Sequence, residues 1–385
     1  MMRLKYRGKL FEDEILASIP ECTLISARGD CSCRSKLVKG ENLKVMKHLL
    51  TKMKLEGGID LVYIDPPFAT GNIFRMSDTK ANAISSSQED GIAYSDELTG
   101  PEYIEFLRER LILIRRLLSD NGSVYVHIDD KIGHYVKVIM DEVFGADRFI
   151  NDIARVKCNP KNFSRHAFGN VKDMILFYSK TGRYIWNEQR IRFSENDINR
   201  LFKKIDKNGR RYTTIPVHAP GETRNGVTGQ PWRGMEPPKG RHWRSNPKSL
   251  DELDKQGLIE WSSKGVPRKI LYADEKQKDG MKLQDILEFK DTQNPDYPTE
   301  KNLELLKLLV STSSHENSVV LDCFCGSGTT LKAAQDLGRA WIGIDQSDMA
   351  IKIATRRLSC GQRTLHSKKH DFEYLVQEDL SNFDP

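Results

Sequence analysis

Short apolar runs interrupt the polar background of the chain at intervals, and their β-branched composition is typical of buried strands. The runs cover residues 59–64, 123–128, 318–321 and 341–344. Between them, apolar residues recur every three or four positions, which predicts amphipathic helices. These helices are expected over residues 102–118, 135–144 and 329–337. The alternation of strands and helices indicates an α/β fold with a doubly wound, mostly parallel sheet and helices on both faces.

The helix predicted over residues 102–118 has one continuous apolar face, with leucine or isoleucine at i, i+4, i+7 and i+11 from Leu107. We expect this face to pack into the core. The arginines of the same helix, Arg110 among them, are then expected on a solvated face rather than at a binding site. The helix over residues 135–144 is expected to end at Gly145, because glycine commonly follows the last helical residue.

The strand predicted over residues 59–64 runs directly into Asp65-Pro66-Pro67-Phe68. Open α/β sheets bind their ligands at the carboxyl ends of strands. The prolines make the turn rigid, because they fix φ and restrict the residue before each of them. Such a turn can offer the Asp65 carboxylate and the Pro66 carbonyl to the two N–H groups of an aromatic amine, with Phe68 stacked on the ring. We therefore predict a catalytic site formed by Asp65, Pro66, Pro67 and Phe68; a strand-ending turn without function is the alternative.

A second motif, Asp322-Cys323-Phe324-Cys325-Gly326-Ser327-Gly328, follows the strand predicted over residues 318–321 and precedes a helix. The free N–H groups and the dipole of a helix N-terminus favour nucleotide binding. The motif is not the dinucleotide fingerprint, because Leu331 stands where that pattern requires glycine or alanine. The next strand ends at Asp345, an acid suited to a ribose diol. The segment therefore predicts a nucleotide site of another kind.

The net charge of +6, from 60 basic and 54 acidic residues, is concentrated in one segment. Residues 201–250 contain eleven Lys and Arg against three Asp and Glu, a local charge of +8, so the rest of the chain carries −2. The segment is rich in turn formers, and tryptophans are interleaved with its arginines. This mixture can contact phosphates by charge and bases by Arg forks or stacking, although a solvated loop region with structural tryptophans has the same composition. The candidate contacts with nucleic acid are Arg210, Arg211, Arg224, Trp232, Arg233, Arg241, Trp243 and Arg244.

The remaining composition excludes two classes of protein. No apolar run approaches the ~20 residues of a membrane span, and the N-terminus does not begin as a signal peptide does. The seven cysteines form no Cys-x-x-Cys pair, so we predict no metal site. A cytoplasmic protein with reduced thiols is expected.

The order of the two motifs, with the amine motif first, resembles the permuted β group of DNA amino-methyltransferases. Two further segments match this group: Gly40-Glu41-Asn42, and the Pro298-Thr299-Glu300-Lys301 that precedes the glycine motif. The resemblance implies a Rossmann-like fold and S-adenosyl-L-methionine as cofactor. The residues that it places at the cofactor are Glu41, Asn42, Asp65, Thr299, Lys301, Asp322, Phe324, Gly326, Ser327, Gly328, Thr329, Thr330 and Asp345.

The same resemblance divides the chain into five parts. These are an N-terminal extension (1–34), a catalytic half (35–150), an inserted target-recognition region (151–290), a cofactor half (291–360) and a C-terminal tail (361–385). It implies a bacterial or phage-encoded enzyme that methylates the N6 amino group of adenine in duplex DNA after base flipping, as modification methyltransferases of restriction systems do. A second copy of the chain and a restriction subunit are the further partners that this group allows.

Three alternatives remain at this point. Cytosine N4 methylation is the same reaction on another amine, but in this group an aspartate at the position of Asp65 favours adenine. Methylation of RNA or of a protein amide is disfavoured by the motif order, and a non-catalytic DNA-binding subunit by two intact motifs. The polar segment over residues 69–100 has no period, and we expect either a lid over the flipped base or a surface loop.

Overall fold

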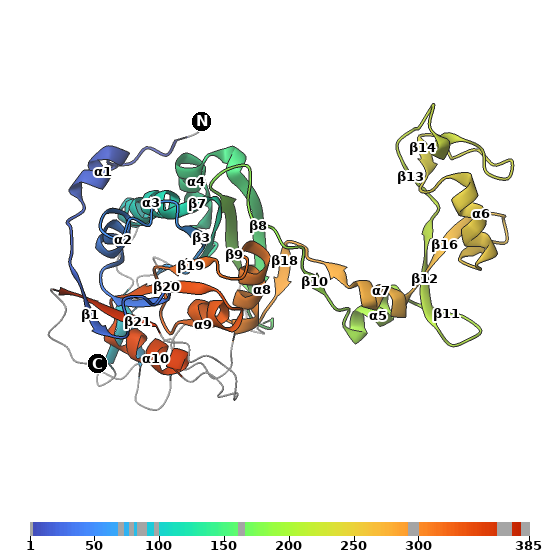
Figure 1. Cartoon of the computed structure of the whole chain (residues 1–385). Helices are drawn as coiled ribbons and strands as arrows, with labels where there is room; N and C mark the ends of the chain where they lie inside the picture. The colour runs from blue at the N-terminus through green and yellow to red at the C-terminus, as the bar shows by residue number, and fades with distance from the viewer. Residues whose placement is uncertain are drawn as a thin grey trace. The chain divides into compact units, whose positions relative to one another are not determined.

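The computed structural model describes residues 3–67, 73–76, 81–82, 91–95, 100–160, 166–291, 300–359 and 372–378. The chain forms two compact units: Met1–Glu188 with Gln284–Pro385, called unit 1 below, and Gln189–Leu283, called unit 2. Unit 1 contains the predicted α/β sheet (Figure 1). Within the described ranges, no helix is long and apolar enough to cross a membrane.

Unit 1 is built on a ten-stranded sheet in the order β1-β21-β2-β20-β19-β3-β7-β9-β8-β18. In that order the strands are Leu24–Arg28, Glu373–Gln377, Lys36–Lys39, Ala340–Asp345, Val319–Asp322, Ile59–Ile64, Leu118–Ile128, Lys172–Ser179, Phe149–Val156 and Ile286–Glu288. Only β1 and β9 run against the other strands. The predicted mostly parallel sheet is therefore confirmed, and the two motif-bearing strands β3 and β19 are direct neighbours in it.

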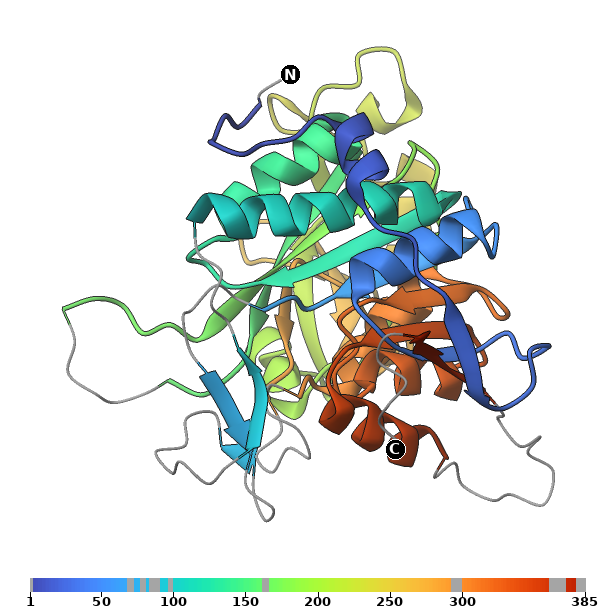
Figure 2. The ribbon, with the colours of Figure 1, turned by 90° about the vertical axis from the view of Figure 1, so that its left-hand side faces the viewer.

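Helices cover both faces of this sheet, with α3 and α4 on one side and α9 and α10 on the other (Figure 2). The helices of unit 1 are α1 (Glu12–Ser18), α2 (Asn42–Thr51), α3 (Gly100–Leu117), α4 (Gly133–Phe144), α8 (Leu303–Ser313), α9 (Thr329–Asp336) and α10 (Asp348–Ser359), with the short helix η1 (Ala146–Arg148). The predicted apolar face of α3 lies in the core, and α4 ends at Gly145, whose φ of 100° favours glycine.

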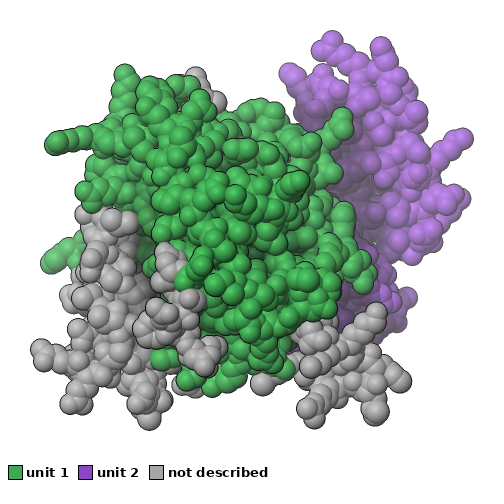
Figure 3. Space-filling model, turned by 60° about the vertical axis from the view of Figure 1, so that its left-hand side comes forward, with its two compact units in different colours: residues 1–188, 284–385 green, residues 189–283 purple. Residues whose placement is uncertain are grey.

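Unit 2 is smaller than the predicted insertion. Residues 151–188 were assigned to the insertion, but β8 and β9 belong to the main sheet, because each forms ladder hydrogen bonds with its neighbours there. The compact unit is instead Gln189–Leu283 (Figure 3). Its elements are β10 (Arg190–Ile191), α5 (Glu195–Leu201), β11 (Lys204–Ile205), β12 (Arg211–Pro216), β13 (His218–Pro220), η2 (Val227–Gly229), β14 (Arg241–Trp243), α6 (Pro247–Lys255), β15 (Ile259–Trp261), β16 (Pro267–Tyr272), α7 (Ala273–Asp279) and β17 (Met281–Lys282).

The segment over residues 69–100 contains more regular structure than its composition predicted. Strands β4 (Ile73–Met76), β5 (Ala81–Asn82) and β6 (Gly91–Ser95) form a small antiparallel sheet in the order β5-β4-β6. The rest of the segment before Gly100 lies outside the described residues, as does Phe68. A role of this segment as a lid stays a prediction.

Candidate active site

The carboxyl ends of β3, β19 and β20 and the first turns of α2 and α9 surround a cavity of about 820 Å³ in unit 1. Both predicted motifs reach it. The predicted residues that line it are Glu41, Asn42, Asp65, Pro66, Pro67, Lys301, Asp322, Phe324, Gly326, Ser327, Thr329, Thr330 and Asp345. Gly328 is not among the lining residues; it precedes α9 as its N-cap, with a φ of 77°. Phe68 and Thr299 lie outside the described residues.

The Asp65 carboxylate stands at the end of β3 with its two oxygens in different environments. Oδ2 accepts a charge-assisted hydrogen bond from the Lys301 ammonium group. Oδ1 is buried and has no hydrogen-bond partner among the described residues. An ionised carboxylate can accept several hydrogen bonds, so Oδ1 is an acceptor available to a ligand.

The glycine motif lies between β19 and α9, as its sequence predicted. Gly326 and Gly328 both have positive φ, and the Gly326 amide donates to the Asp345 carboxylate at 2.9 Å. Leu331, which occupies the third position of the dinucleotide fingerprint, packs over Gly343 of β20. A Cβ atom at Gly343 would lie 2.2 Å from the Leu331 side chain. The helix position therefore carries leucine and the facing strand position carries glycine, so α9 can still pack close to the sheet.

Two acids of the cavity, the buried Asp322 and the partly buried Asp345, favour a cationic ligand. Burial raises the pKa of Asp322 to about 7, although hydrogen bonds from Thr330 and from the Phe324 amide oppose the shift. Burial also raises the pKa of Asp345, against hydrogen bonds from the Ser347 and Gly326 amides. A positively charged group in the cavity would stabilise the ionised forms of both acids.

One wall of the cavity comes from α3, which the sequence did not predict. Arg110 is buried there rather than solvated; it donates to Glu41 and to Asn42, both at 2.6 Å, and lies 3.5 Å from the centroid of the Phe106 ring. Glu41 also caps α2. No local signal marks Arg110, because its partners lie 68 and 69 positions away. The other lining residues that the sequence analysis missed are Gly40, Tyr63, Phe106, Glu300, Cys323, Cys325, Gln346, Ser347, Asp348 and Met349.

The predicted DNA contacts fall into three groups in unit 2. Trp232 and Trp243 are 1% and 3% exposed, and with Val217, Leu250 and Ile259 they form the core of the unit. Their assignment to base stacking is therefore corrected: they are core residues. Arg210 and Arg233 are each engaged by two carboxylates.

The third group keeps its charge available on the surface. Arg241 contacts the His218 ring at 3.2 Å and Arg244 contacts the Pro216 carbonyl at 3.2 Å. Burial and the Arg241 charge lower the pKa of His218, so both partners are neutral. Arg211 and Arg224 are also exposed, and Arg224 lies 3.6 Å from Glu222. These four arginines remain candidates for contacts with phosphates.

The chain is similar to several known proteins. A family model described as DNA methylase matches residues 59–356. The type II methyltransferase M.EcaI of Enterobacter cloacae is 39% identical over 93% of this chain and 78% of its own length. The Mod subunit of the type III restriction-modification enzyme StyLTI of Salmonella typhimurium is 25% identical over 92% of this chain, which spans only 58% of that relative. Among solved structures, the M1.HpyAVI–SAM complex has a TM-score of 0.43 at 15% identity, over 84% of this chain and 98% of its own.

Proposed function

The chain belongs to the DNA methylase family whose model matches residues 59–356, and from this premise we propose that it methylates the N6 amino group of adenine in duplex DNA. Enzymes of this family use S-adenosyl-L-methionine, the cofactor predicted from the sequence. The observation that carries the proposal is the Asp65 carboxylate, whose buried Oδ1 has no partner among the described residues. Such an acceptor costs about 1–3 kcal/mol while it stays unsatisfied, and an entering N–H group removes that cost.

The amine site performs its chemistry through hydrogen bonds. Asp65 Oδ1 accepts one N–H of the adenine amino group and the Pro66 carbonyl accepts the other, which keeps the nitrogen lone pair from delocalising into the ring. When bound, S-adenosyl-L-methionine supplies an electrophilic methyl group on a positively charged sulfur. The amino nitrogen would form the new N–C bond to that methyl group as the C–S bond breaks, and the electron pair of the broken bond would stay with the donor. The methylated nitrogen then loses its proton to water.

No cysteine takes part in this reaction. Cys323 and Cys325 line the cavity, but burial raises the pKa of each thiol well above its ordinary value. The thiolate is the nucleophilic form of cysteine, so both remain unreactive thiols at neutral pH. Direct transfer to nitrogen requires no covalent enzyme intermediate, in agreement with this environment.

The cofactor would lie along the glycine motif. Asp322 would hold the methionine ammonium group and Asp345 the ribose, since both acids stand at strand ends that line the cavity. Phe324 and Phe106, whose ring centroids are 6.1 Å apart, offer an apolar corner for the adenine. Glu41 acts through Arg110, because its carboxylate is already engaged by that guanidinium and by the first turn of α2.

Unit 2 supplies the DNA contacts in this proposal. Arg224, Arg241 and Arg244 lie on and beside the β13–β14 hairpin, where charge attracts the phosphate backbone. The target base must leave the stack to reach a buried carboxylate. The relatives named as a type II methyltransferase and a type III Mod subunit further support a modification enzyme of a restriction system, with a restriction subunit as its partner.

Mass spectrometry of nucleosides from DNA treated with the purified chain and S-adenosyl-L-methionine tests the proposal. We expect N6-methyladenine. N4-methylcytosine would move the assignment to the other amine, and methyl transfer only to RNA or protein, or to nothing, would refute it. Asp65→Asn should abolish transfer, whereas Asp60→Asn should not. Asp60 is a matched control, because it lies on the same strand and accepts hydrogen bonds from Ser119 and Val319 away from the cavity.

A further inference from the structure

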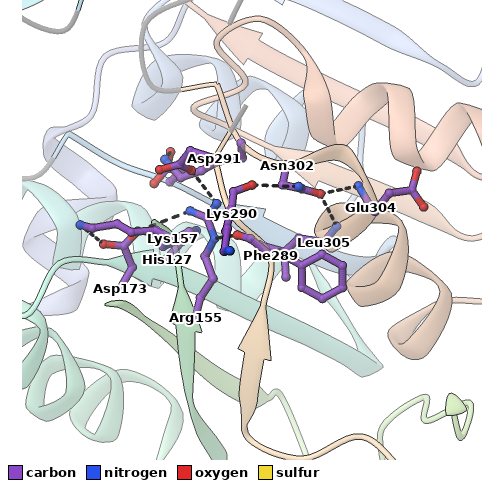
Figure 4. A network of polar contacts seen from close by, with 12 residues as sticks. His127, Arg155, Lys157, Asp173, Phe289, Lys290, Asp291, Asn302, Glu304 and Leu305 are labelled. Carbon is purple, nitrogen blue, oxygen red and sulfur yellow. Dashed lines mark hydrogen bonds and ion pairs between the residues drawn. The ribbon is translucent and has the colours of Figure 1, made fainter. Parts of the chain in front are cut away.

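A chain of buried polar contacts begins at the cavity wall and passes through His127 and Asp173, which Figure 4 shows beside Arg155 and Lys157. Tyr63, which lines the cavity two residues before Asp65, lies 2.8 Å from His127 Nδ1. The other ring nitrogen of His127 lies 3.2 Å from the Asp173 carboxylate. All three side chains are nearly inaccessible to solvent. The reaction described above uses neither His127 nor Asp173.

The proton positions in this chain follow from its electrostatics. Burial lowers the pKa of His127, so its ring is neutral. Burial alone would raise the pKa of Asp173, but the hydrogen bond with His127 and the Lys157 ammonium group, 2.6 Å away, hold it below its ordinary value. An ionised Asp173 must accept the Nε2 proton of His127, which leaves Nδ1 to accept from the Tyr63 hydroxyl. The chain therefore has one fixed orientation.

Asp173 joins the chain to a second set of contacts. Arg155, also fully buried, lies 3.5 Å from Asp173 and donates to the Phe289 carbonyl at 2.8 Å and to the Asp291 carboxylate at 2.5 Å. Two cations, Arg155 and Lys157, thus face two carboxylates, the buried Asp173 and the exposed Asp291, so each buried charge has a partner of opposite sign. The segment 289–291 that Arg155 holds follows β18, the first strand after unit 2.

The same segment is held from its other side by Asn302. The Asn302 side chain donates to the Lys290 carbonyl at 2.9 Å, and its oxygen accepts from the Glu304 and Leu305 amides as the N-cap of α8. The neighbouring Lys301 contacts Asp65. The contacts consequently close into a ring that begins and ends at β3. Its members, called the polar ring below, are Asp65, Lys301, Asn302, the segment 289–291, Arg155, Asp173, His127 and Tyr63.

We propose that the polar ring positions the Asp65 carboxylate, and that Tyr63, His127, Asp173 and Arg155 are positioning residues for methyl transfer. The inference rests on the proposed role of Asp65. Lys301 holds Oδ2 of Asp65. The ring holds Lys301 through the neighbouring Asn302, and it holds β3 through Tyr63. Oδ1 is thereby directed to the amine. A misplacement of about 1 Å at a reacting group can lower a rate by about 10²-fold, so a carboxylate whose two supports share one network is sensitive to a break anywhere in it.

Removing single hydroxyl groups tests the ring with a matched control. Tyr63→Phe breaks the ring at His127. Tyr125→Phe removes an equally buried hydroxyl, which lies 2.7 Å from the Ser313 hydroxyl outside the ring. Both variants should lose a similar few degrees of Tm. Only Tyr63→Phe should lower kcat, by about tenfold or more, with the KM for S-adenosyl-L-methionine unchanged.

A third variant separates the ring from a direct contact of Tyr63 with a ligand. Asp291 does not line the cavity, and Asp291→Asn removes the charge that holds Arg155 at the far side of the ring. It should lower kcat in the same direction as Tyr63→Phe. A loss in Tyr63→Phe alone, a loss in all three variants, or a loss in none would each overturn the proposal.

Hydrogen exchange gives a measurement that does not depend on methyl transfer. Exchange of the Glu304 and Leu305 amides, which Asn302 caps, should accelerate in Tyr63→Phe and in Asp291→Asn. It should not accelerate in Tyr125→Phe, whose partner Ser313 lies at the opposite end of α8. If the wild-type chain transferred no methyl group, the proposed function would fail, and unchanged exchange in both ring variants would separately refute the ring.

Discussion

Replacing Asp322 by asparagine should abolish most of the pH dependence of cofactor binding. Asp322 is fully buried in the cavity, and burial raises its pKa to about 7. An aspartate in water titrates near 4, and each factor of ten in a protonation equilibrium corresponds to about 1.4 kcal/mol. Ionising Asp322 in the empty cavity at high pH therefore costs about 4 kcal/mol, which a cationic ligand can offset.

The sign of the effect follows from proton linkage. Below pH 7 Asp322 is protonated in the free protein, and the methionine ammonium group can pair with it only after its proton leaves. Affinity for S-adenosyl-L-methionine should consequently rise about tenfold per pH unit up to pH 7 and then level off. Titration calorimetry between pH 5.5 and 8.5, in buffers of different ionisation enthalpy, measures both the affinity and the released proton.

Two results would refute this reasoning. The first is a wild-type affinity that stays constant across that pH range, and the second is an Asp322→Asn variant that keeps the full wild-type slope. Asp336→Asn provides the control, because Asp336 lies at the end of α9 and pairs with Lys307 and Lys332 outside the cavity. It should bind the cofactor as the wild type does at every pH.

Three further predictions follow from the same structure. Asp322→Asn should raise the Tm of the cofactor-free protein at pH 8 more than at pH 4, because a carboxyl group whose pKa is raised on folding destabilises the fold increasingly between those values; calorimetric scans at both pH values check this. Gly343→Ala should cost about 1–3 kcal/mol of stability by overpacking Leu331, and a double-mutant cycle with Leu331→Ala should show strong coupling in denaturant titrations. Arg241→Ala should lower the salt slope of DNA binding by about 0.9 in a fluorescence titration, whereas Arg233→Ala, whose charge is engaged by two carboxylates, should leave it nearly unchanged.

The sequence predicted those parts of the site whose signals are local. A strand that ends in an acid identifies Asp65, Asp322 and Asp345 without any knowledge of the packing, and all three line the cavity. Arg110 could not be found in this way, because its environment depends on Glu41, 69 positions away. Arg110 points inward although the opposite face of its helix is apolar. This position is explained only by the packing of α2 beside α3.

Composition alone could not separate a core from a binding surface in unit 2. Tryptophans interleaved with arginines occur both in nucleic-acid sites and in small cores, and the pattern around Trp232 and Trp243 is the same for either. Their burial decides for the core. The start of unit 2 was predicted too early in the chain for a related reason. Strands β8 and β9 extend the main sheet by antiparallel pairing, and no local residue pattern indicates which sheet a strand joins.

The permuted order of the motifs does not disturb the site, because the two motifs follow strands that are neighbours in the sheet, whatever their order along the chain. Val320 and Leu321 of β19 pair directly with Leu61 and Val62 of β3, so the amine turn and the glycine turn emerge side by side from adjacent strands. Two contacts then fasten the halves: Asn42 donates to the Cys323 carbonyl, and Lys301 contacts Asp65. The permutation places a long connection between β3 and β19. This connection contains both the basic unit 2 and the segment 289–291, which belongs to the polar ring.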